Sequence, residues 1–159
     1  MAVEIERKFL VKKSTWDALP KPSGHYYQQA YLLNTPEKTI RVRQTDTQGF
    51  ITIKGATQGI RRSEYEFEIP WTEAGQILDE FCSEKIEKMR YKIPFGGHIF
   101  EVDEFMGRHA GVVVAEVELI DESTEFEKPA WLGREVSDYV RYFNAVMIRS
   151  DWVMPSDVE

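Results

Sequence analysis

Glu4-Ile5-Glu6-Arg7-Lys8 is a short stretch near the N-terminus that alternates in the manner of a β-strand. Because successive side chains of a strand point to opposite faces, Glu4, Glu6 and Lys8 share one face. The other face is largely apolar and carries Val3, Ile5, Phe9 and Val11. Two carboxylates and an ammonium group on one face suit solvent. They also suit a site where carboxylates hold a metal and the lysine meets an anion.

The same charged pattern recurs along the chain, with acidic and basic faces in alternation. A single face of this kind is typical of the solvated side of an antiparallel sheet. Seven such strands in succession instead predict the lining of a shared polar cavity. The later charged faces carry Arg41 with Arg43, Lys54, Glu64 with Glu66 and Glu68, Lys88 with Arg90, Glu101 with Asp103, and Glu116 with Glu118.

The composition of the chain excludes several classes of protein. Its 159 residues are 42% hydrophobic and 13% aromatic, which excludes a disordered chain and predicts a single domain over residues 1–159. The formal net charge of −7 argues against a nucleic-acid or membrane-surface protein, while the locally clustered cations leave an anionic small molecule open. No apolar stretch is long enough to span a bilayer. We expect a cytoplasmic protein, monomeric or homodimeric.

Alternating segments separated by turn residues predict a chain built mostly of strands, with a few helices. The eight expected strands are Val3 to Val11, Tyr26 to Leu33, Lys38 to Thr45, Phe50 to Gly55, Ser63 to Ile69, Ile86 to Pro94, His98 to Phe105 and Gly111 to Ile120. The expected helices are one capped by Thr72 that carries Ala74 to Cys82, a C-terminal one capped by Ser137 or Asp138 that carries Val140 to Met147, and two short ones at Ser14 to Leu19 and Ser123 to Glu127.

The turn signal Gly96-Gly97 predicts the register of one hairpin. With Phe95 facing His98, the charged side of the ladder pairs Arg90 with Asp103 and Lys92 with Glu101. Opposite charges that face each other across strands are favourable by about 0.2–1 kcal/mol.

The turn from Asp46 to Gly49 predicts a second hairpin, with Thr45 facing Phe50. In that register Arg41 lies opposite Lys54, and Arg43 follows on the same face. Like charges in direct opposition destabilise a sheet, so these cations are expected either to be screened by water or to bind an anion.

These residues resemble the motifs of the CYTH superfamily, the triphosphate tunnel metalloenzymes. Glu4 to Val11 is similar to the family's N-terminal Glu-x-Glu-x-Lys signature. The resemblance continues in order over nearly the whole chain. It is carried by Gln29 to Leu32, Ile40 to Arg43, Ile51 to Lys54, Glu64 to Glu66, Lys88 to Tyr91, Phe100 to Asp103, Val114 to Glu118, Gly133 to Ser137 and Arg141 to Asn144.

The resemblance implies an α+β fold, in which a closed eight-stranded antiparallel β-barrel forms a hydrophilic tunnel and helices pack outside. Closure removes the sheet edges, and eight strands leave room for one small ligand. The family's members hydrolyse inorganic triphosphate, thiamine triphosphate or nucleoside triphosphates, or cyclise ATP, with a divalent metal.

Metal-dependent hydrolysis of inorganic tripolyphosphate, a small-molecule substrate, is the first hypothesis. Phosphoryl transfer depends mainly on alignment and charge compensation. Lys8, Tyr31 and Glu6 are expected to act in catalysis, and the resemblance implies that Lys8 and Tyr31 assist proton transfer. The expected triphosphate cradle is Lys8, Arg41, Arg43, Lys54, Lys88, Arg90 and Arg141. The expected ligands of Mg²⁺ or Mn²⁺ are Glu4, Glu6, Glu64, Glu66, Glu101, Asp103, Glu116 and Glu118, and Ca²⁺ is expected to inhibit.

Other functions use the same cradle. A thiamine triphosphatase would add aromatic stacking at the mouth of the tunnel, and a class IV-type adenylate cyclase would add an adenine pocket, which nothing in the sequence marks. A non-catalytic polyphosphate-binding module would need only the cations. The carboxylates argue against that module, because a pure anion binder has no use for them.

Overall fold

The computed structural model describes residues 2–158 and consists mainly of antiparallel strands. The strands are β1 (Val3–Val11), β2 (His25–Asn34), β3 (Lys38–Gln44), β4 (Gly49–Gly55), β5 (Arg61–Ile69), β6 (Ile86–Phe95), β7 (His98–Phe105), β8 (Val113–Glu118) and β9 (Leu132–Glu135). The helices are α1 (Lys13–Ala18), α2 (Trp71–Phe81), α3 (Asn144–Met147) and the 3₁₀ helices η1 (Gly107–His109) and η2 (Val140–Tyr142). All eight predicted strands are present. No helix among these residues is long and apolar enough to cross a membrane.

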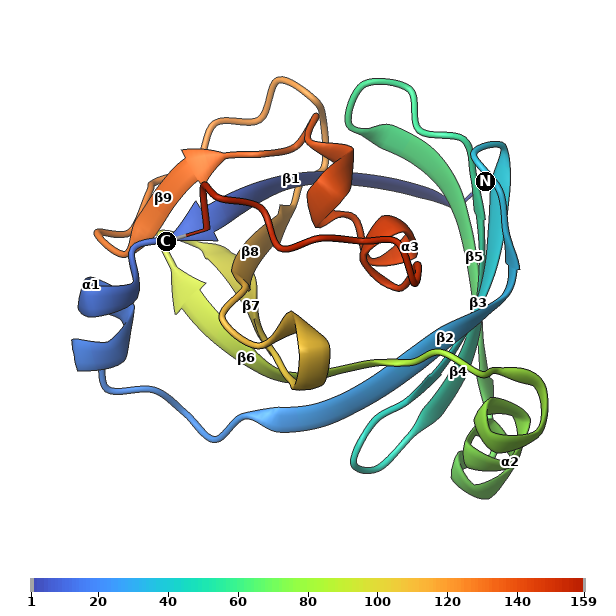
Figure 1. Cartoon of the computed structure of the whole chain (residues 1–159). Helices are drawn as coiled ribbons and strands as arrows, with labels where there is room; N and C mark the ends of the chain where they lie inside the picture. The colour runs from blue at the N-terminus through green and yellow to red at the C-terminus, as the bar shows by residue number, and fades with distance from the viewer. Residues whose placement is uncertain (1, 159) are drawn as a thin grey trace.

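Eight of the strands close into an antiparallel ring, which Figure 1 views from one end. Their order is β5-β4-β3-β2-β6-β7-β8-β1, and β1 also pairs with β5. β1 makes both joins because Val3 faces Ser63 of β5, whereas Lys8 faces Glu116 of β8. β9 pairs with the last residues of β1 as a ninth strand. The predicted closed eight-stranded antiparallel fold is confirmed.

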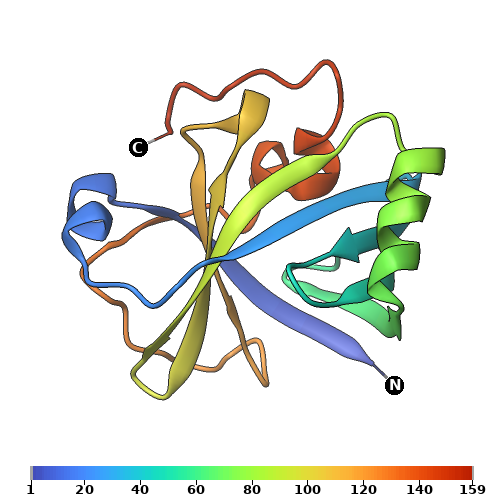
Figure 2. The ribbon, with the colours of Figure 1, turned by 90° about the horizontal axis from the view of Figure 1, so that it is seen from below.

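The outer face of the ring is apolar, and α2 covers it over β2, β3 and β4 (Figure 2). Ala30 and Val42 are fully buried there together with Leu78 of α2. Gly49 permits this close contact, because a Cβ atom at that position would lie only 2.7 Å from the Cβ atom of Ala74.

A second apolar cluster covers the outer face of β1, β7 and β8. Trp16 of α1 packs against Trp131 at 5.2 Å between ring centroids, and Trp131 packs against Phe100 of β7 at 5.6 Å. α1 and the segment before β9 therefore cover the part of the ring that α2 does not reach.

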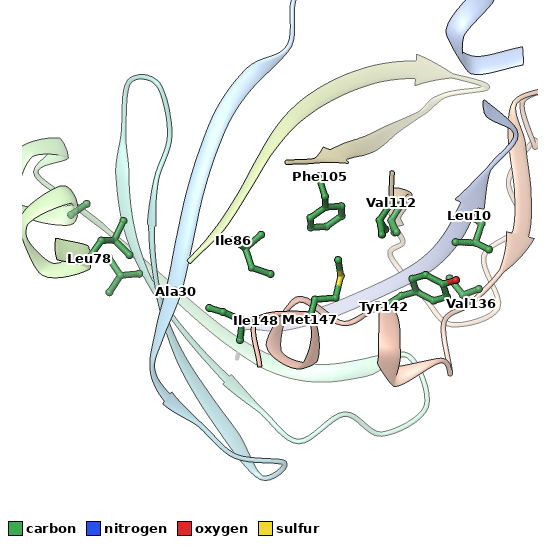
Figure 3. Packing of buried hydrophobic residues seen from close by; sticks show 13 residues of the cluster. Leu10, Ala30, Leu78, Ile86, Phe105, Val112, Val136, Tyr142, Met147 and Ile148 are labelled. Atoms are coloured by element: carbon green, nitrogen blue, oxygen red, sulfur yellow. The ribbon is translucent and has the colours of Figure 1, made fainter. Parts of the chain in front are cut away.

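Apolar side chains fill one end of the ring interior. The inward positions of β1, β6 and β7, which are charged near the middle of the ring, become apolar toward this end. The C-terminal segment packs against them from η2 onward, as Figure 3 shows. The buried cluster at this end includes Leu10, Ile86, Phe105, Tyr142, Met147 and Ile148.

The predicted C-terminal helix differs from the structure in both form and place. Residues Val140–Tyr142 and Asn144–Met147 form two short helices, separated by the extended backbone of Phe143. Lys8 Nζ donates a hydrogen bond to the Tyr142 carbonyl at 3.3 Å, an oxygen that a continuous helix would use itself. The expectation of one helix packed outside the barrel was therefore wrong, because much of this segment packs inside the ring.

Two smaller predictions also need correction. Ser123 to Glu127 is not helical, because the Asp121 carboxylate accepts a hydrogen bond from the Ser123 amide at 2.8 Å and forms a turn there. β9 was not predicted, since its four residues, Leu132–Glu135, are too few to show a clear alternation.

The register of the first hairpin is confirmed and that of the second is wrong. Arg90 lies opposite Asp103 and Lys92 opposite Glu101, around Gly96 and Gly97 with φ of 57° and 81°. In the second hairpin Arg41 faces Thr52 rather than Lys54. The turn lies one residue earlier than predicted, because the Thr45 amide bonds to the Gln48 carbonyl and Gly49 belongs to β4.

Candidate active site

A polar cavity of about 260 Å³ lies inside the ring, beside the filled end. Seven cationic and seven acidic side chains line it, so their formal charges cancel. The cations are Lys8, Arg41, Arg43, Lys54, Arg62, Lys88 and Arg90. The acids are Glu4, Glu6, Glu64, Glu66, Glu101, Glu116 and Glu118.

The acids lie close together in the cavity, with Glu4 beside both Glu6 and Glu64, and Glu6 beside Glu116. Burial, together with the nearby Glu116 and Glu4, raises the pKa of Glu6 well above its usual range. Burial and the Glu4 carboxyl likewise raise the pKa of Glu64 to about 7. Burial also opposes charge on Glu116, but Lys8 and the hydrogen bond with Glu6 hold its pKa well below its usual range. This crowding of carboxyl groups favours a bound cation.

Lys54 forms ion pairs with both Glu4 and Glu64. Its Nζ lies 2.7 Å from Glu4 Oε2 and 3.3 Å from Glu64 Oε2. Glu4 is nevertheless buried, and its Oε1 atom has no hydrogen-bond partner among residues 2–158. One cation is thus shared between two carboxyl groups, which leaves acceptor capacity unused.

A buried cluster around Asp103 supports the cationic wall. Arg90 donates from Nε and Nη2 to the two oxygens of Asp103 at 2.7 and 2.8 Å, and Lys88 Nζ lies 2.8 Å from Asp103 Oδ2. Burial lowers the pKa of Lys88 to about 7 against the opposing effect of Asp103, and Arg90 adds to the lowering. Arg90 also reaches Glu101 Oε2 at 3.3 Å. Asp103 therefore fixes two cations of the cavity from behind.

Arg41 and Arg43 project inward from β3. Arg43 Nε donates to Gln29 Oε1 at 2.8 Å, and its guanidinium lies over the Tyr27 ring at 5.0 Å from the centroid. Arg41 Nη2 donates to Thr52 Oγ1 at 3.2 Å, but Arg41 Nε is buried without a hydrogen-bond partner among residues 2–158. Arg41 thus carries an unused donor beside the cavity.

Lys8 and Tyr31 both line the cavity. Besides its bond to the Tyr142 carbonyl, Lys8 Nζ lies 4.9 Å from the centroid of the Phe143 ring. These contacts hold the ammonium group at the floor of the cavity, on the inward face that it shares with Glu6.

The structure brings together all of the predicted site residues except Asp103 and Arg141. Asp103 lies behind the cavity wall, where Arg90 and Lys88 occupy its oxygens. Arg141 is exposed at the surface and pairs with Asp157 at 2.5 Å, because η2 turns it away from the interior.

Some residues that line the cavity were not predicted from the sequence. Arg62 shares the inward face of β5 with Glu64 and Glu66, and its alternation with them was a usable signal. Ser137, Phe143 and Asn144 come from the C-terminal segment, whose entry into the ring has no counterpart in strand alternation.

Comparison with known families places this cavity in context. A model of the CYTH domain matches residues 2–144, which include every strand of the ring. The chain belongs to the CYTH family. The CYTH match ends at Asn144, in the segment that closes the cavity.

Similar CYTH proteins and structures cover nearly the whole chain. It is 44% identical to the inorganic triphosphatase of Acetivibrio thermocellus, over 96% of this chain and 97% of that protein. It is 36% identical to the inorganic triphosphatase of Nitrosomonas europaea, over 92% of this chain and 97% of that protein. The crystal structure of the inorganic triphosphatase NE1496 superposes with a TM-score of 0.64 at 31% identity and covers 98% of each chain.

The carboxyl groups fit the metal dependence of CYTH triphosphatases, which are metalloenzymes. No group of three or more His, Cys, Asp or Glu side chains among residues 2–158 is placed to hold a metal ion. The seven carboxyl groups of the cavity are instead interspersed with cations, and Glu4 keeps an acceptor atom without a hydrogen-bond partner among these residues. Mg²⁺ is usually bound by one or two carboxylates, with water and substrate phosphates completing its shell. The donor set therefore suits a hard cation that is bound together with an anionic ligand.

Proposed function

We propose that this CYTH protein hydrolyses inorganic tripolyphosphate to pyrophosphate and phosphate in a metal-dependent reaction. The observation that carries the proposal is that equal numbers of cationic and carboxyl side chains line the cavity. The cations suit the phosphate oxygens, and the carboxyls suit the metal that accompanies them. Phosphoryl transfer depends almost entirely on positioning and electrostatic stabilisation, and the cavity supplies charged groups of both signs for them.

The side chains divide the work by position. Arg41, Arg43, Lys54, Lys88 and Arg90 bind the phosphate oxygens, with arginine giving bidentate contacts and lysine giving point charges. Lys8 and Tyr31 assist proton transfer at the reacting phosphate.

Carboxyl groups on neighbouring strands would hold the metal. Glu4, Glu6, Glu64 and Glu116, with Glu118, are the residues best placed for Mg²⁺ or Mn²⁺. The metal supplies charge neutralisation and Lewis acidity when it is bound. Glu66 and Glu101 lie beside Arg41 and Arg90 and orient them through ion pairs of 3.6 and 3.3 Å.

The filled end of the ring favours a short substrate. A chain of phosphates that enters from the open end meets the floor made by Phe143 and Asn144. A long polyphosphate would have to extend back into solvent. We therefore infer a small-molecule triphosphate as substrate. The net charge of −7 argues against a nucleic-acid or membrane partner, and we infer a protein of the cytoplasm.

Phosphate release tests the proposal. The purified protein is incubated with tripolyphosphate, long-chain polyphosphate, ATP and thiamine triphosphate, each with Mg²⁺ or Mn²⁺ and each again with EDTA. We expect tripolyphosphate to be hydrolysed fastest and EDTA to abolish release. Cyclic AMP as the main product from ATP would identify a cyclase, and tight EDTA-insensitive binding without release would identify a binding module.

A second prediction concerns ligand-induced stability. Because the carboxyl groups give a metal an incomplete shell, we expect Ca²⁺ alone to raise the thermal midpoint little and Ca²⁺ with tripolyphosphate to raise it clearly. A ligand that binds only the folded protein at a hundredfold excess over Kd stabilises it by about 2.7 kcal/mol. Ca²⁺ is used because we expect it to support binding and inhibit turnover. Equal shifts from sulfate or monophosphate would indicate general charge screening and contradict the prediction.

A further inference from the structure

Asn144 is connected to two cations of the cavity, to one directly and to the other through Gln29. Its Oδ1 accepts hydrogen bonds from Lys88 Nζ at 2.8 Å and from Gln29 Nε2 at 3.0 Å. The reversed amide would set its NH2 group against two donors, so these contacts fix which atom faces them. Gln29 in turn accepts the hydrogen bond from Arg43 Nε at 2.8 Å. Asn144 therefore contacts Lys88 directly and Arg43 through Gln29.

The partners of Asn144 are deeply buried, so the loss of its oxygen should matter. Gln29 is fully buried and Lys88 is 1% exposed, so water has little access to replace a lost partner. Without the Asn144 oxygen, Lys88 keeps Asp103 as its charged partner and is drawn toward it. Gln29 would lose the acceptor that sets its amide orientation, and with it the fixed oxygen that Arg43 uses.

We propose that Asn144 is a positioning residue, which holds Lys88 and Arg43 in the orientation that receives the triphosphate. The inference rests on the proposed function. The C-terminal segment then contributes to substrate binding as well as filling one end of the ring. It does so because it places a neutral acceptor, Asn144 Oδ1, next to the cations of the cavity.

The backbone of the same segment is held separately from its side chain. Arg108 Nη2 donates to the carbonyls of Met147, Ile148 and Arg149 at 3.1, 2.7 and 2.9 Å. Asn34 Nδ2 donates to the Ala145 carbonyl at 2.8 Å. Asn34→Ala is therefore a matched control, since it removes a side-chain hydrogen bond to the neighbouring residue of the segment and leaves Lys88, Gln29 and Arg43 untouched.

The test compares Asn144→Ala with Asn34→Ala. We expect Asn144→Ala to lower kcat/KM for tripolyphosphate about tenfold or more, mostly through KM, and Asn34→Ala to change it less than twofold. A double-mutant cycle with Lys88→Ala separates positioning from a general structural effect. If Asn144 acts through Lys88, its replacement costs much less when Lys88 is already alanine.

Binding measured by calorimetry with Ca²⁺ and tripolyphosphate keeps the inference testable apart from turnover. A wild-type protein that binds but releases no phosphate would sink the proposed hydrolysis, while the Kd values of the variants would still judge Asn144. Equal effects of Asn144→Ala and Asn34→Ala, or full additivity with Lys88→Ala, would overturn the inference. Should Asn144→Ala fail to fold, Gln29→Met takes its place, because it removes the link between Asn144 and Arg43 and keeps the hydrogen bond between Asn144 and Lys88. We expect Gln29→Met to raise the Kd several-fold, and an unchanged Kd would also overturn the inference.

Discussion

Replacing Arg41 by alanine should lower kcat/KM for tripolyphosphate by about a hundred- to a thousandfold without lowering the thermal midpoint. A preorganised donor that faces developing charge in an active site is worth about this much. Arg41 has an Nε atom that is buried without a hydrogen-bond partner among residues 2–158. Because an unpaired buried donor costs free energy in the folded protein, its removal relieves the fold while it disables the site.

Arg61→Ala is the matched control for this prediction. Arg61 is likewise an arginine on a strand of the ring, at the start of β5, but its side chain is exposed and pairs with Glu122 at 2.7 Å outside the cavity. Steady-state kinetics and thermal unfolding of the two variants give a direct comparison. An Arg41→Ala enzyme with the wild-type kcat/KM would contradict the placement of Arg41 in the phosphate cradle.

The lining of the cavity could be predicted from sequence because a closed ring turns one face of every strand inward. Alternation alone assigned Glu4, Glu6 and Lys8 to that face, and the structure places them there. The second hairpin shows that this assignment of side chains to the inward face tolerates an error in register. Its register was wrong by two residues, yet a shift of two keeps each side chain on its own face, so Arg41 and Lys54 still line the cavity.

Depth along the ring axis was not predictable in the same way. Glu101 and Asp103 share the inward face of β7, and alternation treats them alike. The hairpin register predicted Arg90 opposite Asp103, but only the structure shows that Lys88 also contacts Asp103, so that both of its oxygens are occupied, while Glu101 borders the cavity. The neighbours that decide this come from β6 by pairing and from the packing of the interior, which a single strand does not encode.

The C-terminal segment was the hardest part to predict. Its apolar spacing favoured a helix, and the expectation of an outer cover followed from the apolar outer faces of the strands. The extended Phe143 breaks that helix, and the apolar ends of the inward faces at Leu10, Ile86 and Phe105 receive the segment instead. This outcome depends on contacts between residues more than a hundred positions apart, such as Lys8 with Tyr142.

The saturation of Asp103 leads to the largest expected effect on stability. Asp103→Ala should lower the free energy of unfolding by about 3–5 kcal/mol, because it leaves Lys88 and Arg90 buried without their shared counter-ion. Urea unfolding at constant m-value measures the loss. Glu122→Ala is the control, since it breaks the exposed pair with Arg61 and should cost only about 0–1 kcal/mol.

Ligand binding separates this structural role from metal coordination. Tripolyphosphate with Ca²⁺ brings negative charge to the cavity side of Lys88 and Arg90, so it should recover part of the stability that Asp103→Ala removes. The ligand should then raise the unfolding free energy of the variant by more than it raises that of the wild type. If Asp103 were instead a metal ligand, the variant would gain less from Ca²⁺ and tripolyphosphate than the wild type does. The sign of that difference therefore decides whether Asp103 serves the cations, as its contacts at 2.7 and 2.8 Å indicate, or the metal.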